Sequence, residues 1–164
     1  MRKRSTFTLS ILLWLGTATV AHAQDPILRV VSLDGVEHPI AAQAWSTLPR
    51  TSVQAIEHDG KEVRFEGVAA REVLKLVDAP LGAALRGKNL AVYVLAEAAD
   101  GYRAVYALAE FDADFTDRII LIADRRDGQA LSEKEGKLRI VVPGEKRPAR
   151  WLRELVSIGL KRAP

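Results

Sequence analysis

Apolar and polar residues alternate along several short stretches of the chain, and three pairs of these stretches flank an Asp-Gly dipeptide. Alternation with a period of two is typical of strands that bury one face, and Asp-Gly favours a tight hairpin turn. The sequence therefore predicts three β-hairpins. Their strands span 27–33 with 36–40, 53–58 with 62–68, and 90–96 with 102–107, around the turns Asp34-Gly35, Asp59-Gly60 and Asp100-Gly101.

The remaining pattern predicts more strands and two short helices. Apolar runs at 118–123, 138–142 and 154–160 are typical of buried strands. Residues 41–48 and 69–77 have helical spacing, and each stretch stops at or just before a proline. Strands outnumber helices and no strand–helix–strand alternation occurs. We expect one α+β domain with mostly antiparallel mixed sheets.

The first residues have the pattern of a secretory signal peptide. Arg2, Lys3 and Arg4 precede the apolar run 7–20, and Ala21-His22-Ala23 is typical of a cleavage site. The expected organisation is a signal peptide over 1–23 and a single domain over 24–164, located in the periplasm or secreted. The apolar run is shorter than the roughly 20 residues of a membrane span, so no span is expected after cleavage.

Charge and composition exclude several classes of function. Without the signal peptide the chain has 21 Lys and Arg against 21 Asp and Glu, a balance that argues against nucleic acid as a partner. It contains no cysteine, which excludes thiolate catalysis, cysteine-bound zinc and iron–sulfur clusters. His38 and His58 are isolated, so no metal site is predicted. Motifs of hydrolases, dinucleotide-binding proteins and P-loop proteins are absent.

A basic loop follows the predicted strand 138–142. After Pro143-Gly144 come Lys146, Arg147 and Arg150, and then Trp151. Several cationic donors on one loop suit a phosphate, because lysine supplies a point charge and arginine a bidentate fork. The alternative is a solvated loop in which Trp151 returns the chain to the core.

Tyr102 and Arg103 form a second candidate site, directly after the turn Asp100-Gly101. Neighbouring residues of a strand point to opposite faces, so we expect at most one of the two to face the basic loop unless the strand is bulged. The alternative is an ordinary hairpin in which Tyr102 pairs across the strands.

The order of these signals resembles a known family. The segments LDGVEHPI, FEGVAAREVLKLV, AADGYRAVYALAEF, IILIADRRDGQAL and GKLRIVVPGEKRPARWLRELVSIGL are similar to the oxidoreductase molybdopterin-binding domain, which has the sulfite-oxidase-like fold, in its small exported form. The resemblance covers about 28–160. It implies mixed sheets around a cleft, molybdopterin as a possible cofactor, and the pterin phosphate beside Arg150-Trp151. The ligand site that we infer consists of Tyr102, Arg103, Lys146, Arg147 and Arg150.

The sequence departs from the catalytic members of that family, which bind molybdenum through a cysteine. The segment 65–69, where the resemblance places that cysteine, offers Glu66 as an oxygen ligand at most. Two hypotheses follow. The domain binds pterin or another small anion without cysteine-dependent molybdenum chemistry, or it is a non-catalytic accessory module that binds a periplasmic redox or protein partner. Neither hypothesis assigns a catalytic residue.

Overall fold

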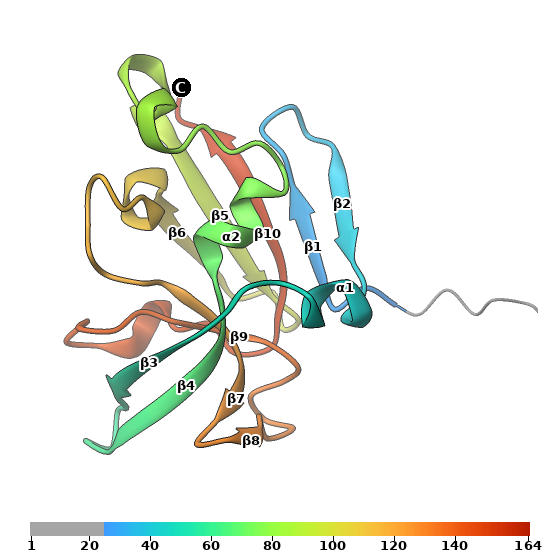
Figure 1. The fold of residues 1–164 in the computed structure, drawn as a ribbon, viewed down its shortest axis with the longest axis vertical. Coiled ribbons are helices and arrows are strands. Elements are labelled where there is room, and N and C mark those ends of the chain that lie inside the picture. Colours follow the sequence, from blue (N-terminus) through green and yellow to red (C-terminus); the bar gives the residue numbers. More distant parts are fainter. Residues whose placement is uncertain (1–24) are drawn as a thin grey trace, which may run out of the picture.

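Two β-sheets form the body of the protein (Figure 1). The computed structural model describes residues 25–164, so the predicted signal peptide lies outside the described residues. The larger sheet has the strand order β2-β1-β10-β5-β6, and the smaller has β3-β4-β7-β8 with β9 also paired to β7. The strands are β1 (Leu28–Val31), β2 (Glu37–Ile40), β3 (Arg50–Ile56), β4 (Glu62–Ala69), β5 (Val92–Ala98), β6 (Arg103–Ala107), β7 (Leu121–Arg126), β8 (Gln129–Ala130), β9 (Arg139–Val141) and β10 (Leu155–Arg162).

The helices are short and lie in the connections between strands. None of the helices within 25–164 is long and apolar enough to cross a membrane. The α-helices are α1 (Ala42–Ser46) and α2 (Ala70–Lys75), and the 3-10 helices are η1 (Gly82–Ala84), η2 (Gly87–Ala91), η3 (Leu108–Phe111) and η4 (Pro148–Arg150).

The three predicted hairpins are confirmed as β1–β2, β3–β4 and β5–β6. Their turns contain Gly35, Gly60 and Gly101, whose φ angles of 88°, 81° and 84° favour glycine over any residue with a side chain. The predicted α+β class with mostly antiparallel sheets is also confirmed. One pairing is parallel, between β1 and β10, and it places the last strand of the chain in the middle of the larger sheet.

The strand predicted at 118–123 begins three residues later and runs to Arg126. The reason lies in the partner strand, because β4 ends at Ala69 and the chain enters α2 at Ala70. The carbonyl of Ile120 accepts the backbone N–H of Ala70, an N–H that a helix leaves unpaired in its first turn, and the pairing of β4 with β7 ends there.

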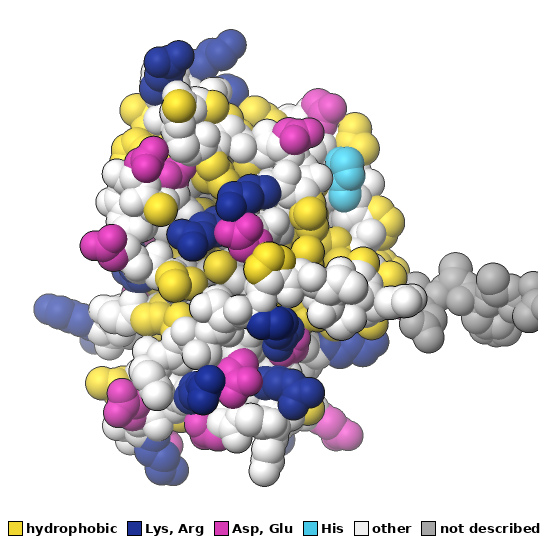
Figure 2. Space-filling model, viewed as in Figure 1, with side chains coloured by type: hydrophobic (Ala, Val, Ile, Leu, Met, Phe, Trp, Pro, Cys, Tyr) yellow, Lys and Arg dark blue, Asp and Glu magenta, His cyan; other side chains and the backbone are white. Residues whose placement is uncertain are grey.

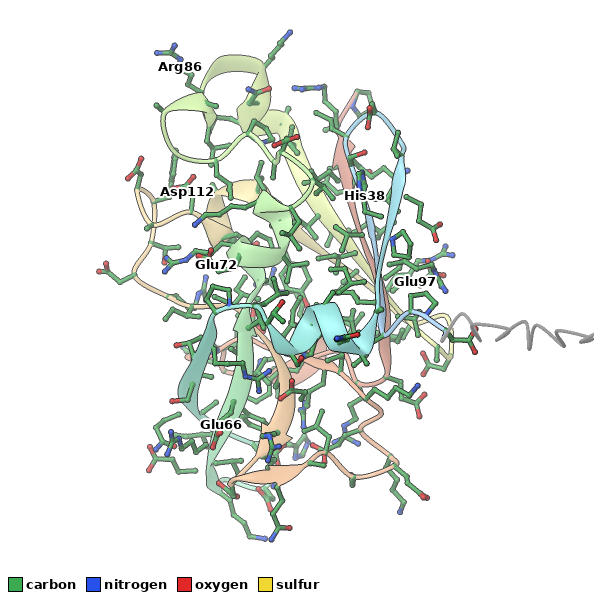
Figure 3. All side chains as sticks on the ribbon, turned by 45° about the vertical axis from the view of Figure 1, so that its right-hand side comes forward. His38, Glu66, Glu72, Arg86, Glu97 and Asp112 are labelled. Carbon is green, nitrogen blue, oxygen red and sulfur yellow. The ribbon has the colours of Figure 1, made fainter. Side chains whose placement is uncertain are left out.

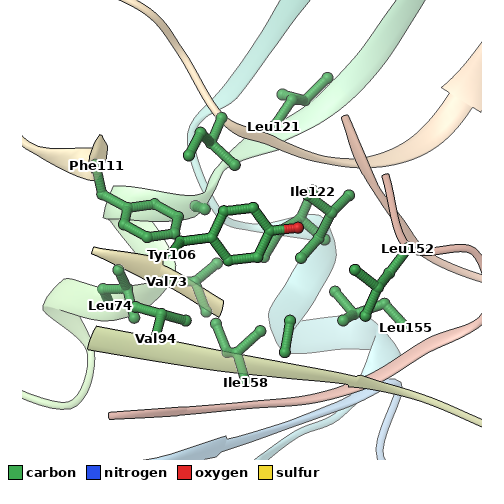
Figure 4. Close-up of a cluster of buried hydrophobic side chains, with 14 of the residues drawn as sticks. Val73, Leu74, Val94, Tyr106, Phe111, Leu121, Ile122, Leu152, Leu155 and Ile158 are labelled. Atoms are coloured by element: carbon green, nitrogen blue, oxygen red, sulfur yellow. The ribbon is translucent and has the colours of Figure 1, made fainter. Parts of the chain in front are cut away.

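The hydrophobic core lies between the two sheets and includes α2 (Figure 4). Val73 and Leu74 of α2 are fully buried, as are Tyr106 of β6 and Ile122 of β7. Burial of one such aliphatic side chain contributes about 1.5–3 kcal/mol. The core therefore fixes the position of one sheet relative to the other, and the loops at their ends are positioned with it.

β4 and β7 approach one another most closely at Gly67. A Cβ added there would lie 2.0 Å from the carbonyl oxygen of Ile122 and 2.7 Å from the Cα of Ala123, and the register between the strands shifts at this point. Both neighbours are backbone atoms. They move only if the strands separate.

We expect Gly67→Ala to lower the free energy of unfolding by about 2 kcal/mol or more, because the added methyl group forces apart two strands of the core. Gly159→Ala is the matched control, since its added Cβ would meet Val31 at an ordinary 3.5 Å. Urea denaturation of both variants measures the difference, and equal stabilities would contradict the close approach.

Candidate functional site

A cleft of about 720 Å³ opens between the turns of two hairpins and the loop that precedes β10. Its size lies within the range of small-ligand sites. The β3–β4 hairpin contributes Glu57, His58 and Asp59, and the β5–β6 turn contributes Asp100 and Tyr102. The remaining lining residues are Ala98, Lys134, Arg139, Pro148, Ala149, Trp151, Leu152, Arg153 and Glu154.

Arg139 of β9 stands at the base of the cleft with its side chain only 3% exposed. Its Nη1 lies 2.5 Å from Oε1 of Glu135 and 3.1 Å from Oε1 of Glu57. The other oxygen of Glu57 lies 2.7 Å from Nη2 of Arg126. Two arginines and two carboxylates therefore neutralise one another where water has little access, and we call these four residues the Arg139 cluster.

Two aromatic rings enclose the guanidinium of Arg139. Its Cζ lies 4.9 Å from the ring centroid of Phe65 and 5.9 Å from that of Trp151, and the two rings meet edge to face. Such contacts attract a cation to the ring faces. Within residues 25–164, Nε of Arg139 and Nε1 of Trp151 are buried and have no hydrogen-bond partner.

Burial, the hydrogen bonds and the ion pair of Glu135 determine the pKa of its carboxyl group. Burial raises the pKa of its carboxyl group, but hydrogen bonds from Ser132 and the ion pair with Arg139 outweigh burial and hold the pKa below the ordinary value of 4.5. Glu135 is therefore ionised in the folded protein at neutral pH, as its contact with Arg139 requires.

The wall of the cleft carries charges of both signs. Asp59, Asp100 and Glu154 supply carboxylates, while Lys134 and Arg153 supply cations that make no ion pair with another described side chain. The same mixture extends over much of the surface, where acidic and basic side chains are neighbours (Figure 2). The cleft therefore suits a ligand that presents donors together with acceptors or an anionic group.

Tyr102 lines this cleft, and its hydroxyl donates a hydrogen bond to the carbonyl of Ala149 at 2.8 Å. It thus contacts the basic loop, within the expectation that at most one of the two hairpin residues would face it. Arg103 does not line the cleft. Its Nη2 lies 2.9 Å from Oε1 of Glu97 on the exposed side of β5 and β6.

Arg150 is held by carboxylates of the protein itself. It forms ion pairs with Glu110, at 3.0 Å, and with Glu145, and its guanidinium lies 4.8 Å from the ring centroid of Tyr106. Burial raises the pKa of Glu110, but the hydrogen bonds from Arg150 lower it further, so the net shift is downward. These contacts leave Arg150 little capacity to bind an external anion.

Lys146 and Arg147 are the exposed cations of the basic loop, and neither makes an ion pair with another residue in 25–164. The loop borders the cleft through Pro148 and Ala149. The role of the five residues in binding a ligand stays a prediction. Their arrangement places Tyr102 at the cleft, Arg103 away from it, and two free cations on the loop beside it.

The strand residues 65–69 do not contribute to the cleft. They belong to β4, which is paired with β3 on one side and β7 on the other, and Phe65, Val68 and Ala69 are buried. Oε1 of Glu66 lies 3.7 Å from Nε of Arg64, and Figure 3 places it on the lower sheet. Within 25–164 no group of three His, Asp or Glu residues gathers as a metal site. The geometry therefore gives Glu66 no role as a ligand in the cleft.

The Arg139 cluster was missed in the sequence, although one signal for it was present. Arg139 is the single charged residue within the otherwise apolar run 138–142. A charge in a buried strand requires a partner, because an isolated charge is costly to remove from water. Glu57 and Glu135 lie 82 and 4 positions away in the sequence, so pattern alone did not identify them.

We expect Arg139→Ala to lower the free energy of unfolding by about 3 kcal/mol, because it removes the buried counter-charge of Glu57 and Glu135 and leaves only the more exposed Arg126 beside them. Arg103→Ala is the control, since it removes an exposed pair with Glu97 that is worth about 1 kcal/mol at most. Urea denaturation at neutral pH compares the two. A loss for Arg139→Ala no greater than that of the control would contradict the account.

The lowered pKa of Glu135 also predicts how stability depends on pH. An ionised carboxyl group with a lowered pKa stabilises the fold above 4.5, and this contribution is lost as the pH falls through its folded-state value. We therefore expect Glu135→Gln to lose less stability than the wild type between about pH 5 and pH 3. The urea denaturation midpoints of the variant and the wild type, measured across this pH range, test the prediction. Parallel pH profiles of the two proteins would contradict it.

Comparison with known proteins gives two findings and one negative result. The family model described as the oxidoreductase molybdopterin binding domain matches residues 38–162. The crystal structure of the sulfane dehydrogenase SoxCD from Paracoccus pantotrophus is similar with a TM-score of 0.63 and 17% sequence identity, over 82% of this chain and 37% of that chain. The chain thus spans little more than a third of that protein, and the likeness confirms the predicted fold. No curated protein matches. Because the family model matches most of the sequence, the chain belongs to the oxidoreductase molybdopterin-binding domain family.

Proposed function

We propose that the chain is an exported domain that binds a pterin-type ligand in its cleft and does not perform cysteine-dependent molybdenum chemistry. The observation that carries the proposal is the composition of the cleft. It has the size and mixed charge of a small-ligand site, and its lining includes no thiolate.

The residues of this chain do not fit molybdenum as the family binds it. A thiolate is a soft, deprotonated ligand, and the sequence contains no cysteine to supply one. The carboxylate nearest the base of the cleft is Glu57, and both of its oxygens are already paired with arginines. No reaction step through a molybdenum centre is therefore assigned to this chain.

The pterin part of the cofactor fits better. Its ring edge presents N–H donors, which suit the carboxylates of Asp59 and Asp100, and its flat face suits the half-exposed ring of Tyr102. A phosphate suits the unpaired cations of the basic loop, Lys146 and Arg147. These are matches of chemical type, and they support binding rather than turnover.

Export is part of the proposal. It is supported by the three basic residues at the start of the chain, the apolar run that follows and the cleavage pattern before Gln24. The lack of cysteine is compatible with an oxidising compartment, because a domain of this size can be stable without disulfides. Mass spectrometry of the N-terminus of protein recovered from the periplasm or medium tests it, with Gln24 expected as the first residue.

Ligand binding is tested by titrating the purified protein with neopterin monophosphate and following the fluorescence of the pterin. We expect Lys146→Ala combined with Arg147→Ala to raise the Kd about tenfold, because two charge-assisted contacts to the phosphate are lost. Arg86→Ala with Lys88→Ala is the control, since these exposed cations belong to the distant η2 region.

Three outcomes of the titration are informative. Weaker binding by the loop variant alone supports the proposed site. Equal binding by both variants contradicts the role of the basic loop. No binding by the wild type contradicts the pterin proposal and favours the second hypothesis, a non-catalytic module whose partner is a protein.

A further inference from the structure

We infer that Tyr102 is a positioning residue of the ligand site, because its hydroxyl group holds the basic loop against the wall of the cleft. The inference rests on the proposed function and deepens it. It names the side chain that joins the part of the site suited to a pterin ring to the part suited to a phosphate.

Two tyrosine hydroxyl groups bind consecutive carbonyls of the basic loop. Tyr102 donates to the carbonyl of Ala149 at 2.8 Å, and Tyr106 of β6 donates to the carbonyl of Arg150. Tyr106 is fully buried and lies among core side chains (Figure 4). Tyr102 is 52% exposed and lines the cleft. Tyr106 therefore anchors the loop in the core, whereas Tyr102 is the contact that a ligand in the cleft can reach.

The backbone of Tyr102 is held on both sides by the β5–β6 turn. Its N–H donates to Oδ1 of Asp100 at 2.9 Å, and its carbonyl accepts the N–H of Ala98 at 2.9 Å. Gly101 completes the turn with a φ angle of 84°, which glycine adopts without strain. The hydroxyl group of Tyr102 therefore extends toward the basic loop from a fixed hairpin end.

Other contacts hold the loop to itself and to β6 and η3. Arg150 pairs with Glu145 of the same loop and with Glu110 of η3, and its Nη1 donates to the carbonyl of Val105 at 3.3 Å. The hydrogen bond of Tyr102 is different, because it joins the loop to the β5–β6 turn and so to the wall of the cleft. The position of the loop relative to the cleft therefore depends on this hydroxyl group.

A loop that is held in place before a ligand arrives binds it more tightly, because its conformational freedom is not lost on binding. Lys146 and Arg147 are the two cations that benefit, since they directly precede η4 and make no ion pair with another residue in 25–164. The ring of Tyr102 suits the flat face of a pterin. A ligand that spans the cleft thus meets Tyr102 directly through its ring and indirectly through its phosphate.

Limited digestion with trypsin tests the positioning of the loop without any ligand. Trypsin cleaves after Lys146, whereas Pro148 protects the bond after Arg147. In the full mature protein we expect Tyr102→Phe to be cleaved after Lys146 about threefold faster than the wild type, because the loss of one hydrogen bond raises the population of the open loop.

Two controls accompany the digestion. Tyr93→Phe is the matched variant, because Tyr93 lies at the end of β5 that is remote from the turn. Cleavage after Lys88 in η2 reports opening elsewhere in the same protein, and its rate is expected to be equal in both variants and the wild type. Equal rates of cleavage after Lys146 in the two tyrosine variants would overturn the inference.

A double-mutant cycle tests whether Tyr102 acts through the loop cations. In the wild type we expect Tyr102→Phe to raise the Kd for neopterin monophosphate about threefold. In a protein that already carries Lys146→Ala and Arg147→Ala, the same substitution is expected to cause no further weakening, because the loop has no cation left to position. The same threefold loss in both backgrounds would contradict the positioning role, since the hydroxyl group would then act on the ligand directly.

Failure of the inference and failure of the proposed function are distinguishable. The digestion contains no ligand, so its result decides the contact between Tyr102 and the loop by itself. A wild type that does not bind neopterin monophosphate would overturn the proposed function and the role of Tyr102 in the ligand site, even if the hydroxyl group protects the loop from trypsin.

Discussion

The buried guanidinium of Arg139 is the interaction on which the rest of the structure depends. It joins β9 to the end of β3 through Glu57, to the loop before β9 through Glu135, and to the chain that leads into β10 through the ring of Trp151. Glu57 is distant in sequence from the other segments, which are also joined by backbone hydrogen bonds from Ile140 to Leu152 and from Glu154 to Glu135. Because a buried charge without partners is costly, all of them must take their positions together. The base of the cleft and the return of the chain into the larger sheet therefore both depend on contacts of Arg139.

The basic residues fall into two groups, according to whether carboxylates of the protein neutralise them. Arg139 and Arg150 are each neutralised by two carboxylates of the protein, so their charges maintain the fold. Lys146, Arg147 and Lys134 lack such partners within 25–164 and remain available to a ligand. The family's soft metal ligand is missing from the sequence, and the best-placed carboxylate is already committed to arginines. The domain thus has a ligand-sized cleft in the fold of the molybdopterin-binding family and no cysteine for a thiolate-bound metal, and these two features support our proposal of pterin binding.

The sequence predicted the fold well where the signals are local. Asp34-Gly35, Asp59-Gly60 and Asp100-Gly101 identified three hairpins, because a turn and its flanking alternation are read within a few residues. It failed where long-range contacts decide: β7 starts late because its partner strand β4 ends at Ala69, and β10 pairs in parallel with the first strand. For the site, Tyr102 was a candidate in the sequence and lines the cleft, while its role in binding a ligand stays a prediction. Arg150 was expected in the ligand site, but Glu110 lies 40 positions away in the sequence, so the pattern held no sign of its partner.

The central claim is that this domain keeps the family's cleft and has no cysteine-dependent molybdenum centre. The most direct measurement is the content of molybdenum, tungsten and releasable pterin per chain, determined on protein recovered from its native compartment. The account predicts far less than one metal per chain, with pterin present or replaceable by added pterin phosphate. Molybdenum or tungsten near one per chain would contradict it, because the metal would then be held by ligands that the structure assigns to other partners.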